Sequence, residues 1–185
     1  MTRDRAKQKR SGGRSDAVAI GPIVSSAHLA SGALPGLSEV EYGLILANHA
    51  FERWMARGMA AAGVPNLSPV EIMLLHTVRH RDRPKKLADI CLVLGIDDTH
   101  VVTYAIKKLE AAGLVTSKRA GKEKVVTATR DGAEACQRYH QVRERLLVTS
   151  VQSAGLPDLT LSEIGALLRA LSGHYDQAAR AATSL

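Results

Sequence analysis

Polar side chains that could recognise a ligand by hydrogen bonds gather on one face of a helix predicted over residues 98–112. At about 100° per residue, this face lies opposite an apolar stripe. The stripe consists of Val102, Ala105, Ile106 and Leu109. The candidate base-contacting residues on the opposite face are His100, Thr103, Tyr104 and Lys107. Because no carboxylate precedes Glu110, the face is suited to read base edges in a major groove. An ordinary solvated helix face is the alternative.

Other residues with reactive or metal-binding side chains do not form a site. His76 and His80 lie four residues apart and could bind a metal ion, but no glutamate follows His76 and no third ligand is near in sequence. We therefore interpret them as ordinary polar side chains on a helix surface. Cys91 and Cys136 each lie alone in an apolar helical stretch and give no disulfide framework or metal-ligand pair. No nucleophile elbow, phosphate-binding loop or dinucleotide motif appears. We expect no enzyme, no metal and no cofactor.

Positive charge is concentrated in three segments. The chain has a net charge of +7 and a pI of about 9.7, which favours a polyanionic partner such as nucleic acid or an anionic membrane surface. Residues 1–16, 79–86 and 98–130 each carry a net charge of +4, and the remainder is mildly acidic. The candidate phosphate contacts are Lys85, Lys86, Lys108, Lys118, Arg119, Lys122 and Lys124. A single run of charged residues is commonly just a solvated surface, but three basic runs in one chain suggest a common function.

The elements that must position these groups are two short helices and a hairpin. Apolar residues at helical spacing predict a helix over 87–94, in which Cys91 is a small core residue. Gly95 can end it in the left-handed conformation, and Asp97 or Asp98 can cap the next helix. A turn this short packs the two helices as a helix-turn-helix. Two β-branched segments, 114–119 and 124–130, then predict a hairpin whose tip carries Lys122 and Lys124.

Capping boxes predict where the upstream helices begin. Ser38 to Glu41 and Ser68 to Glu71 both have the spacing in which the serine and glutamate side chains satisfy free backbone N–H groups. The first begins a helix over 39–62, which ends at Gly63. The second begins a helix over 69–80. The residues expected to face inward on this second helix are Val70, Met73, Leu74 and Thr77.

Two further helices are predicted after the hairpin. One runs from Asp131 to about Ala154, and a third capping box, Thr160 to Glu163, begins the other. Their apolar surfaces are too large for one winged helix to bury alone, which indicates a homodimer interface shared with the 39–62 helix. The candidate interface residues are Phe51, Trp54, Leu146, Leu147, Ile164, Leu168 and Leu171.

A helix-turn-helix followed by a basic hairpin is a winged helix, and short motifs accompany it here. In chain order they are Leu87-Ala88, Gly95, Thr103, Leu109-Glu110, Gly113-Leu114-Val115 and Thr129-Arg130-Asp131-Gly132. This series resembles the MarR family of bacterial transcription regulators, closely over residues 64–135 and more loosely over 39–182. In the wing, the family's Asp-x-Arg element, whose arginine enters the minor groove, is replaced by Ala-Gly-Lys-Glu-Lys. Because lysine lacks the planar fork of arginine, we expect this wing to hold phosphate only.

The resemblance implies a dimeric repressor that binds a pseudo-palindromic duplex site. The family's N- and C-terminal helices form the dimer, and small aromatic or phenolic effectors often bind between those helices and the winged helix. No residue of such an effector pocket can be assigned from the sequence.

We therefore expect a mainly α fold with a small β-hairpin wing, in which dimerisation helices flank the winged helix-turn-helix. Residues 1–37 form a basic, disordered arm, and residues 38–185 form the MarR-like domain. Within it, 64–130 is the winged helix-turn-helix, and 39–62 and 131–182 are the dimerisation helices. The partners are double-stranded DNA, a second copy of the chain and a small-molecule effector. The alternative is a winged-helix module for protein or nonspecific RNA contacts; a membrane-surface or enzymatic role is a remote third.

The cysteine content and the N-terminal segment indicate the cellular compartment in which the protein is expected. Residues 17–38 carry no charge and follow a basic start, as in a secretory signal, but glycine, proline, serine and histidine interrupt them. We expect no export and no membrane span. Two isolated cysteines fit a reducing cytoplasm.

Overall fold

The computed structural model describes residues 33–121 and 123–185. Its elements are α1 (Pro35–Ala61), α2 (Pro69–Arg79), η1 (His80–Asp82), β1 (Lys85–Lys86), α3 (Leu87–Leu94), α4 (Thr99–Ala111), β2 (Val115–Ala120), β3 (Glu123–Ala128), α5 (Arg130–Arg143), η2 (Glu144–Val148), α6 (Thr149–Ser153) and α7 (Asp158–Ala182). The chain divides after Asn48 into two units, so α1 belongs to both. Most of the expected arm, residues 1–32, lies outside the described residues, as does Lys122.

Helix α2 begins with the predicted capping box. Ser68 Oγ accepts a hydrogen bond from the Glu71 backbone N–H, and Glu71 Oε2 accepts one from the Ser68 N–H at 2.8 Å. The predicted inward face was incomplete, although Val70 and Met73 do pack against the core. The apolar residues buried on α2 are Ile72, Leu74, Leu75 and Val78, whereas Val70, Met73 and Thr77 are half-buried. Because α2 contacts α3, α4, α5 and β3, its buried surface is wider than one stripe.

The helix-turn-helix is confirmed. Gly95 ends α3 with φ of 63°, in the left-handed region. Asp98 caps α4 by accepting a 2.8 Å hydrogen bond from the His100 N–H. The residues buried on α4 are those of the predicted stripe, Val102, Ala105, Ile106 and Leu109. They pack in a core with residues of α1, α2, α3 and α5, so the opposite face of α4 is left to solvent.

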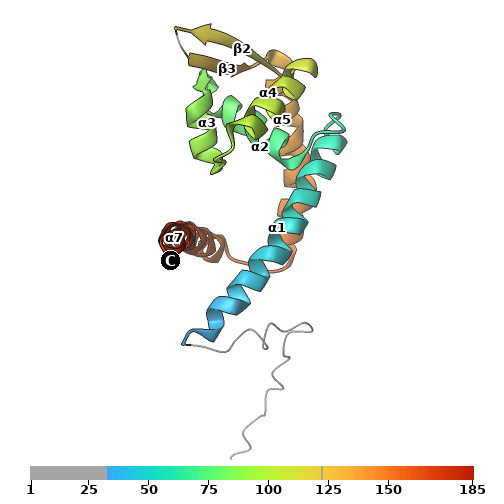
Figure 1. The fold of residues 1–185 in the computed structure, drawn as a ribbon. Coiled ribbons are helices and arrows are strands. Elements are labelled where there is room, and N and C mark those ends of the chain that lie inside the picture. Colours follow the sequence, from blue (N-terminus) through green and yellow to red (C-terminus); the bar gives the residue numbers. More distant parts are fainter. Residues whose placement is uncertain (1–32, 122) are drawn as a thin grey trace, which may run out of the picture. The chain divides into compact units, whose positions relative to one another are not determined.

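The wing is a three-stranded antiparallel sheet in the order β1-β3-β2. Strands β2 and β3 pair from Val115 opposite Ala128 to Ala120 opposite Glu123, and Figure 1 shows them as a hairpin next to α4. The third strand was not predicted: Lys85 and Lys86 pair with Val126 and Val125 of β3. A two-residue strand has no alternating pattern, and it forms here because β3 offers a free edge.

Thr129 and Gly132 join the wing to α5. Thr129 caps α5 by accepting a hydrogen bond from the Gly132 N–H at 3.0 Å, and its hydroxyl donates to the Gly113 carbonyl at 2.7 Å. The Thr129 N–H donates to the Leu114 carbonyl. A Cβ on Gly132 would collide with that same carbonyl oxygen, so only glycine fits. This contact gives the Thr-x-x-Gly spacing a physical reason.

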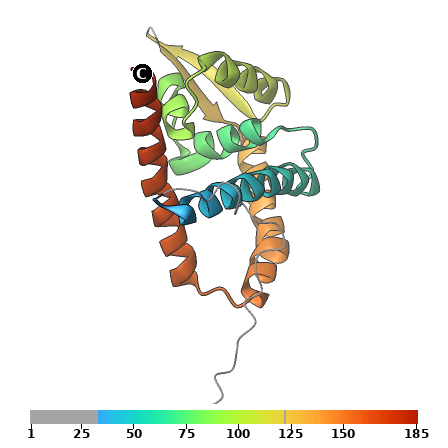
Figure 2. The same ribbon diagram turned by 60° about the horizontal axis from the view of Figure 1, so that its bottom comes forward.

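Beyond α5 the backbone stays helical through the π-helical segment η2 into α6, and Figure 2 shows the run as one orange helix. It corresponds to the helix predicted from Asp131 to about Ala154. The predicted first residues of two helices were wrong. Helix α1 begins at Pro35 and α7 at Asp158, so the capping boxes at Ser38 and Thr160 lie inside helices. Proline at the start of α1 and an aspartate in the first turn of α7 favour these earlier starts.

The fold is therefore mainly helical with a small antiparallel sheet, and it is a winged helix, as predicted. Among the residues that the structure describes, no helix is both long enough and apolar enough to cross a bilayer.

Candidate nucleic-acid interface

The exposed face of α4 carries the predicted recognition residues. His100, Tyr104 and Lys107 are exposed and Thr103 is half-buried; Tyr104 is 64% exposed. The structure adds Val101, which is 42% exposed although it is apolar. At about 100° per residue it lies at the edge of this face, on the side of Tyr104. An exposed valine can contact a thymine methyl group.

The wing supplies two cations that no carboxylate of the described residues neutralises. Lys118 and Arg119 are exposed on β2, and Arg119 lies opposite Lys124 of β3. Within residues 33–121 and 123–185, neither side chain forms an ion pair, and the same holds for Lys107 on α4. These three residues are the candidate contacts whose charge is fully available to an anionic partner.

Three other candidate phosphate contacts are paired with carboxylates. Lys86 Nζ lies 2.8 Å from Glu123, Lys108 Nζ 2.9 Å from Glu71, and Lys124 Nζ 3.9 Å from Glu110. Lys124 lies within β3, so the prediction that it sits at the hairpin tip was wrong; the strands reach closer to the turn than the β-branched residues indicated. Glu110 also accepts a hydrogen bond from the Ser117 hydroxyl, which fastens α4 to β2.

Lys85 stabilises the loop between α2 and α3. Its ammonium donates to the backbone carbonyls of His80 at 2.6 Å and Arg83 at 2.9 Å. The pKa of Lys85 is lowered, first by burial and then by the nearby charges of Arg83 and Arg81. Arg81 has a φ of 59°, a conformation that costs energy in a residue with a Cβ. Lys85 thus supplies hydrogen bonds to two backbone carbonyl groups of a strained loop.

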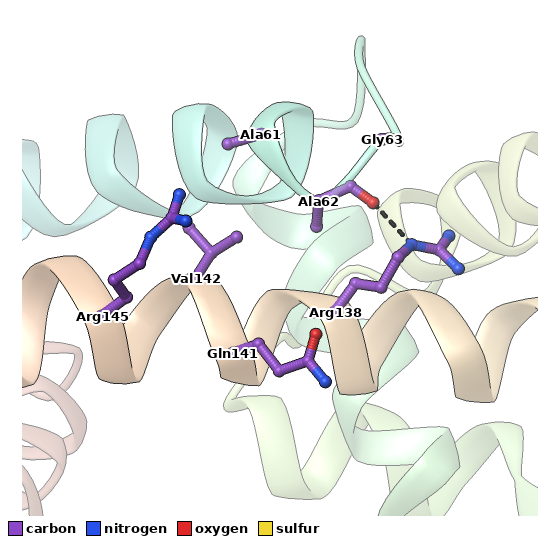
Figure 3. Close-up of a pocket in the computed structure, with 7 residues that line it drawn as sticks. All are labelled: Ala61, Ala62, Gly63, Arg138, Gln141, Val142 and Arg145. Atoms are coloured by element: carbon purple, nitrogen blue, oxygen red, sulfur yellow. Dashed lines mark hydrogen bonds between the residues drawn. The ribbon is translucent and has the colours of Figure 1, made fainter.

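A cavity of about 600 Å³ lies where α1 ends beside α5. Figure 3 shows Arg138 directed to the carbonyl oxygen of Ala62, which accepts a 2.8 Å hydrogen bond from Arg138 Nε. Arg145 reaches toward α1 from further along the same helical run (Figure 3). The Arg138 bond satisfies a free carbonyl at the end of α1.

A second cavity, of about 630 Å³, is lined mainly by apolar residues of α1, α2 and α5. Within it, His76 packs edge-on against Tyr139, with ring centroids 5.0 Å apart. His76 Nε2 is buried and has no hydrogen-bond partner among the residues that the structure describes. Burial lowers the pKa of His76, which favours the neutral ring. Among the described residues, no group of three or more metal-binding side chains comes together here or elsewhere.

Both cysteines belong to the core. Cys136 is buried, and burial raises the pKa of its thiol to about 11. Cys91 is half-buried and packs against the core, as expected from its place on the α3 stripe. A thiol with a raised pKa is a poor nucleophile.

The candidate dimer residues fall into two groups. Trp54 is half-buried and packs against Tyr139 of its own chain, with ring centroids 6.2 Å apart, while Leu147 and Leu171 are half-buried. The exposed members are Phe51, Leu146, Ile164 and Leu168. No residue of α7 is buried, and the helix also exposes Leu159, Leu161 and Leu167.

Residues 67–132 match the family model described as a winged helix DNA-binding domain. No curated protein matches the chain. Among solved structures, a mutant of MarR from E. coli complexed with operator DNA has a TM-score of 0.62 at 16% identity, covering 76% of this chain and 99% of that one. A MarR family transcriptional regulator from Rhodococcus sp. RHA1 has a TM-score of 0.57 at 16% identity, covering 76% and 96%.

CouR from Rhodococcus jostii RHA1, in a structure with bound p-coumaroyl-CoA, also has a TM-score of 0.57 at 16% identity, covering 71% of this chain and 90% of that one. At these identities the likeness is one of fold. Residues 67–132 are therefore similar to winged helix DNA-binding domains, and the chain has the fold of the MarR-family transcription regulators.

Proposed function

We propose that this protein is a transcription regulator that binds duplex DNA with the exposed face of α4 and the adjoining wing. The observation that carries the proposal is the juxtaposition of a donor-rich helix face with unpaired cations. His100 and Tyr104 are exposed on α4, and Lys118 and Arg119 are exposed on β2, which contacts α4. An α-helix fits the major groove, and flanking cations neutralise phosphates.

The two kinds of contact have different roles. Base contacts are assigned to His100, Thr103, Tyr104 and Lys107. Phosphate contacts are assigned first to Lys118 and Arg119, because their charges are unpaired among the described residues. Lys86 and Lys124 contribute less, since Glu123 and Glu110 neutralise them.

Selection of bound fragments from random duplex, followed by Ala variants of Thr103, Tyr104 and His100, tests this assignment. Each variant is expected to cost about 1 to 3 kcal/mol on the selected site and little on random duplex. Preferential binding to single-stranded RNA, or no preference among duplexes, would favour the alternative of a nonspecific or protein-binding module.

We also propose that the protein is a homodimer, because α7 has no buried residue and presents a row of leucines to solvent. A two-fold dimer would place two α4 helices on half-sites about one helical turn apart. Leu168→Asp with Leu171→Asp should convert a dimer of about 40 kDa into monomer or aggregate. Ser162→Asp with Ala166→Asp adds the same charge on the opposite face of α7 and should leave the dimer intact. A wild-type monomer of normal stability would contradict the proposal.

The cavity that contains His76 is our candidate effector site, and the proposed mode of regulation is repression relieved by the effector. Its apolar lining and His76 Nε2, which has no hydrogen-bond partner in the described part of the chain, suit an aromatic ligand with one hydrogen-bond donor or acceptor. Trp54, the single tryptophan of the chain, lines this cavity and reports occupancy by fluorescence. A compound that releases DNA without changing Trp54 fluorescence would place the effector elsewhere.

A further inference from the structure

A buried carboxylate links α2 to the recognition helix. The Glu71 side chain is only 3% exposed, and Glu71 is the one charged residue in the buried core of the described chain. Its oxygen Oε2 accepts from the Ser68 N–H at 2.8 Å, within α2's own capping box. Its other oxygen, Oε1, lies 2.9 Å from Nζ of Lys108, on α4.

The link continues to a side chain that we assign to base contact. Lys108 Nζ lies 5.8 Å from the centre of the Tyr104 ring, one helical turn earlier on α4. That distance is within the range of a cation–π interaction. Tyr104 is 64% exposed, so few protein contacts hold its ring. The lysine therefore connects a buried group in the core to an exposed ring on the surface.

The pair stays charged at the pH of DNA binding. Burial alone would raise the pKa of Glu71, but hydrogen bonds from Lys108 and Ser68 outweigh it, and the pKa of Glu71 lies below its usual value. The same contact raises the pKa of Lys108. Because a buried carboxylate without a counter-charge is strongly unfavourable, Lys108 cannot leave Glu71 to bind a phosphate without cost.

We propose that Glu71 is a positioning residue for DNA recognition. Through Lys108 it holds the Tyr104 ring in place and fixes the position of α4 against α2. It also keeps Lys108 from acting as a phosphate contact. This inference rests on the proposed function. It assigns to Lys108 an internal role in place of the phosphate role predicted from its charge.

Glu71→Gln tests the proposal with little change of shape, since glutamine also serves in a capping box. Affinities of the full-length protein for the selected site and for random duplex are measured over a range of salt. We expect the ratio of the two affinities to fall at least about fivefold, the loss of one weakened base contact. We expect random-duplex affinity to rise and the salt slope to steepen by about 0.9 per protomer, because Lys108 becomes available to phosphate.

Two controls separate positioning from folding. Ser68→Ala removes the capping hydroxyl but leaves the Glu71–Lys108 pair, so it should lower thermal stability without changing the ratio. Glu71→Gln with Lys108→Met removes the pair without changing net charge and leaves no buried unpaired carboxylate. This double variant should lower the ratio of the two affinities and leave the salt slope at its wild-type value.

A ratio unchanged by Glu71→Gln would overturn the proposal. So would a double variant whose salt slope falls by about one contact per protomer, which would show Lys108 to be a phosphate ligand. If the wild-type protein itself has no preferred sequence, the proposed function fails, and that result appears in the wild-type measurement before any variant is compared.

Discussion

Arg119→Ala should reduce the salt dependence of DNA binding, because Arg119 is an exposed cation on β2 that forms no ion pair among the described residues. Each neutralised phosphate contributes about 0.9 to the slope of log affinity against log salt, so a dimer that loses two contacts should lose about 1.8. Between about 50 and 200 mM salt, the wild-type affinity should therefore fall about twelvefold more than that of the variant. Titration of a random duplex at several salt concentrations measures this difference.

The matched control removes a cation that is already paired. Lys86 lies 2.8 Å from Glu123, and both side chains are about half exposed. Lys86→Met with Glu123→Gln abolishes the pair without changing net charge, so the slope should stay at its wild-type value. Arg119→Lys should also keep the slope, since the charge is retained. An unchanged slope in Arg119→Ala, or an equal loss in the Lys86 and Glu123 variant, would refute the assignment of phosphate contacts.

Three further predictions concern the core, the cavity and the arm. Gly132→Ala should destabilise the fold by about 3 kcal/mol or more in chemical denaturation, because the added Cβ collides with the Leu114 carbonyl; a loss below about 1 kcal/mol would contradict that packing. Burial lowers the pKa of His76 in the folded state, so its contribution to stability is complete above its unfolded pKa of about 6.5 and is lost as pH falls through the folded pKa. His76→Phe should flatten the decline in melting temperature below that pH, and an equally steep decline would point to other titratable groups. Deletion of residues 1–16 should weaken binding to all duplexes alike and flatten the salt dependence, whereas a lost sequence preference would show the arm to read the minor groove.

Local sequence signals predicted the helix-turn-helix well. Gly95, Asp98 and the stripe on α4 are signals that act within a few residues of one another. Helix α2 was harder to orient, because most of its side chains are apolar and helical spacing alone does not select the buried face. At Ser38 and Thr160, correct capping spacing was overridden by earlier helix starts.

The candidate interface was predictable only in part. The exposed face of α4 follows from helical geometry, and the structure places His100, Tyr104 and Lys107 on it. The sequence does not show which lysines lack an ion-pair partner, because Lys86, Lys108 and Lys124 contact their carboxylates only after the chain folds. The same holds for β1, whose two lysines become a strand only through pairing with β3.

In the function proposed above, the exposed face of α4 reads a particular base sequence. The most direct measurement is the ratio of wild-type affinities for the best selected duplex and for a scrambled duplex of equal length, at about physiological salt. We expect a ratio of about 1,000 or more, as for specific DNA-binding proteins. A ratio near one would contradict it, because the basic wing would then bind DNA without any reading by α4.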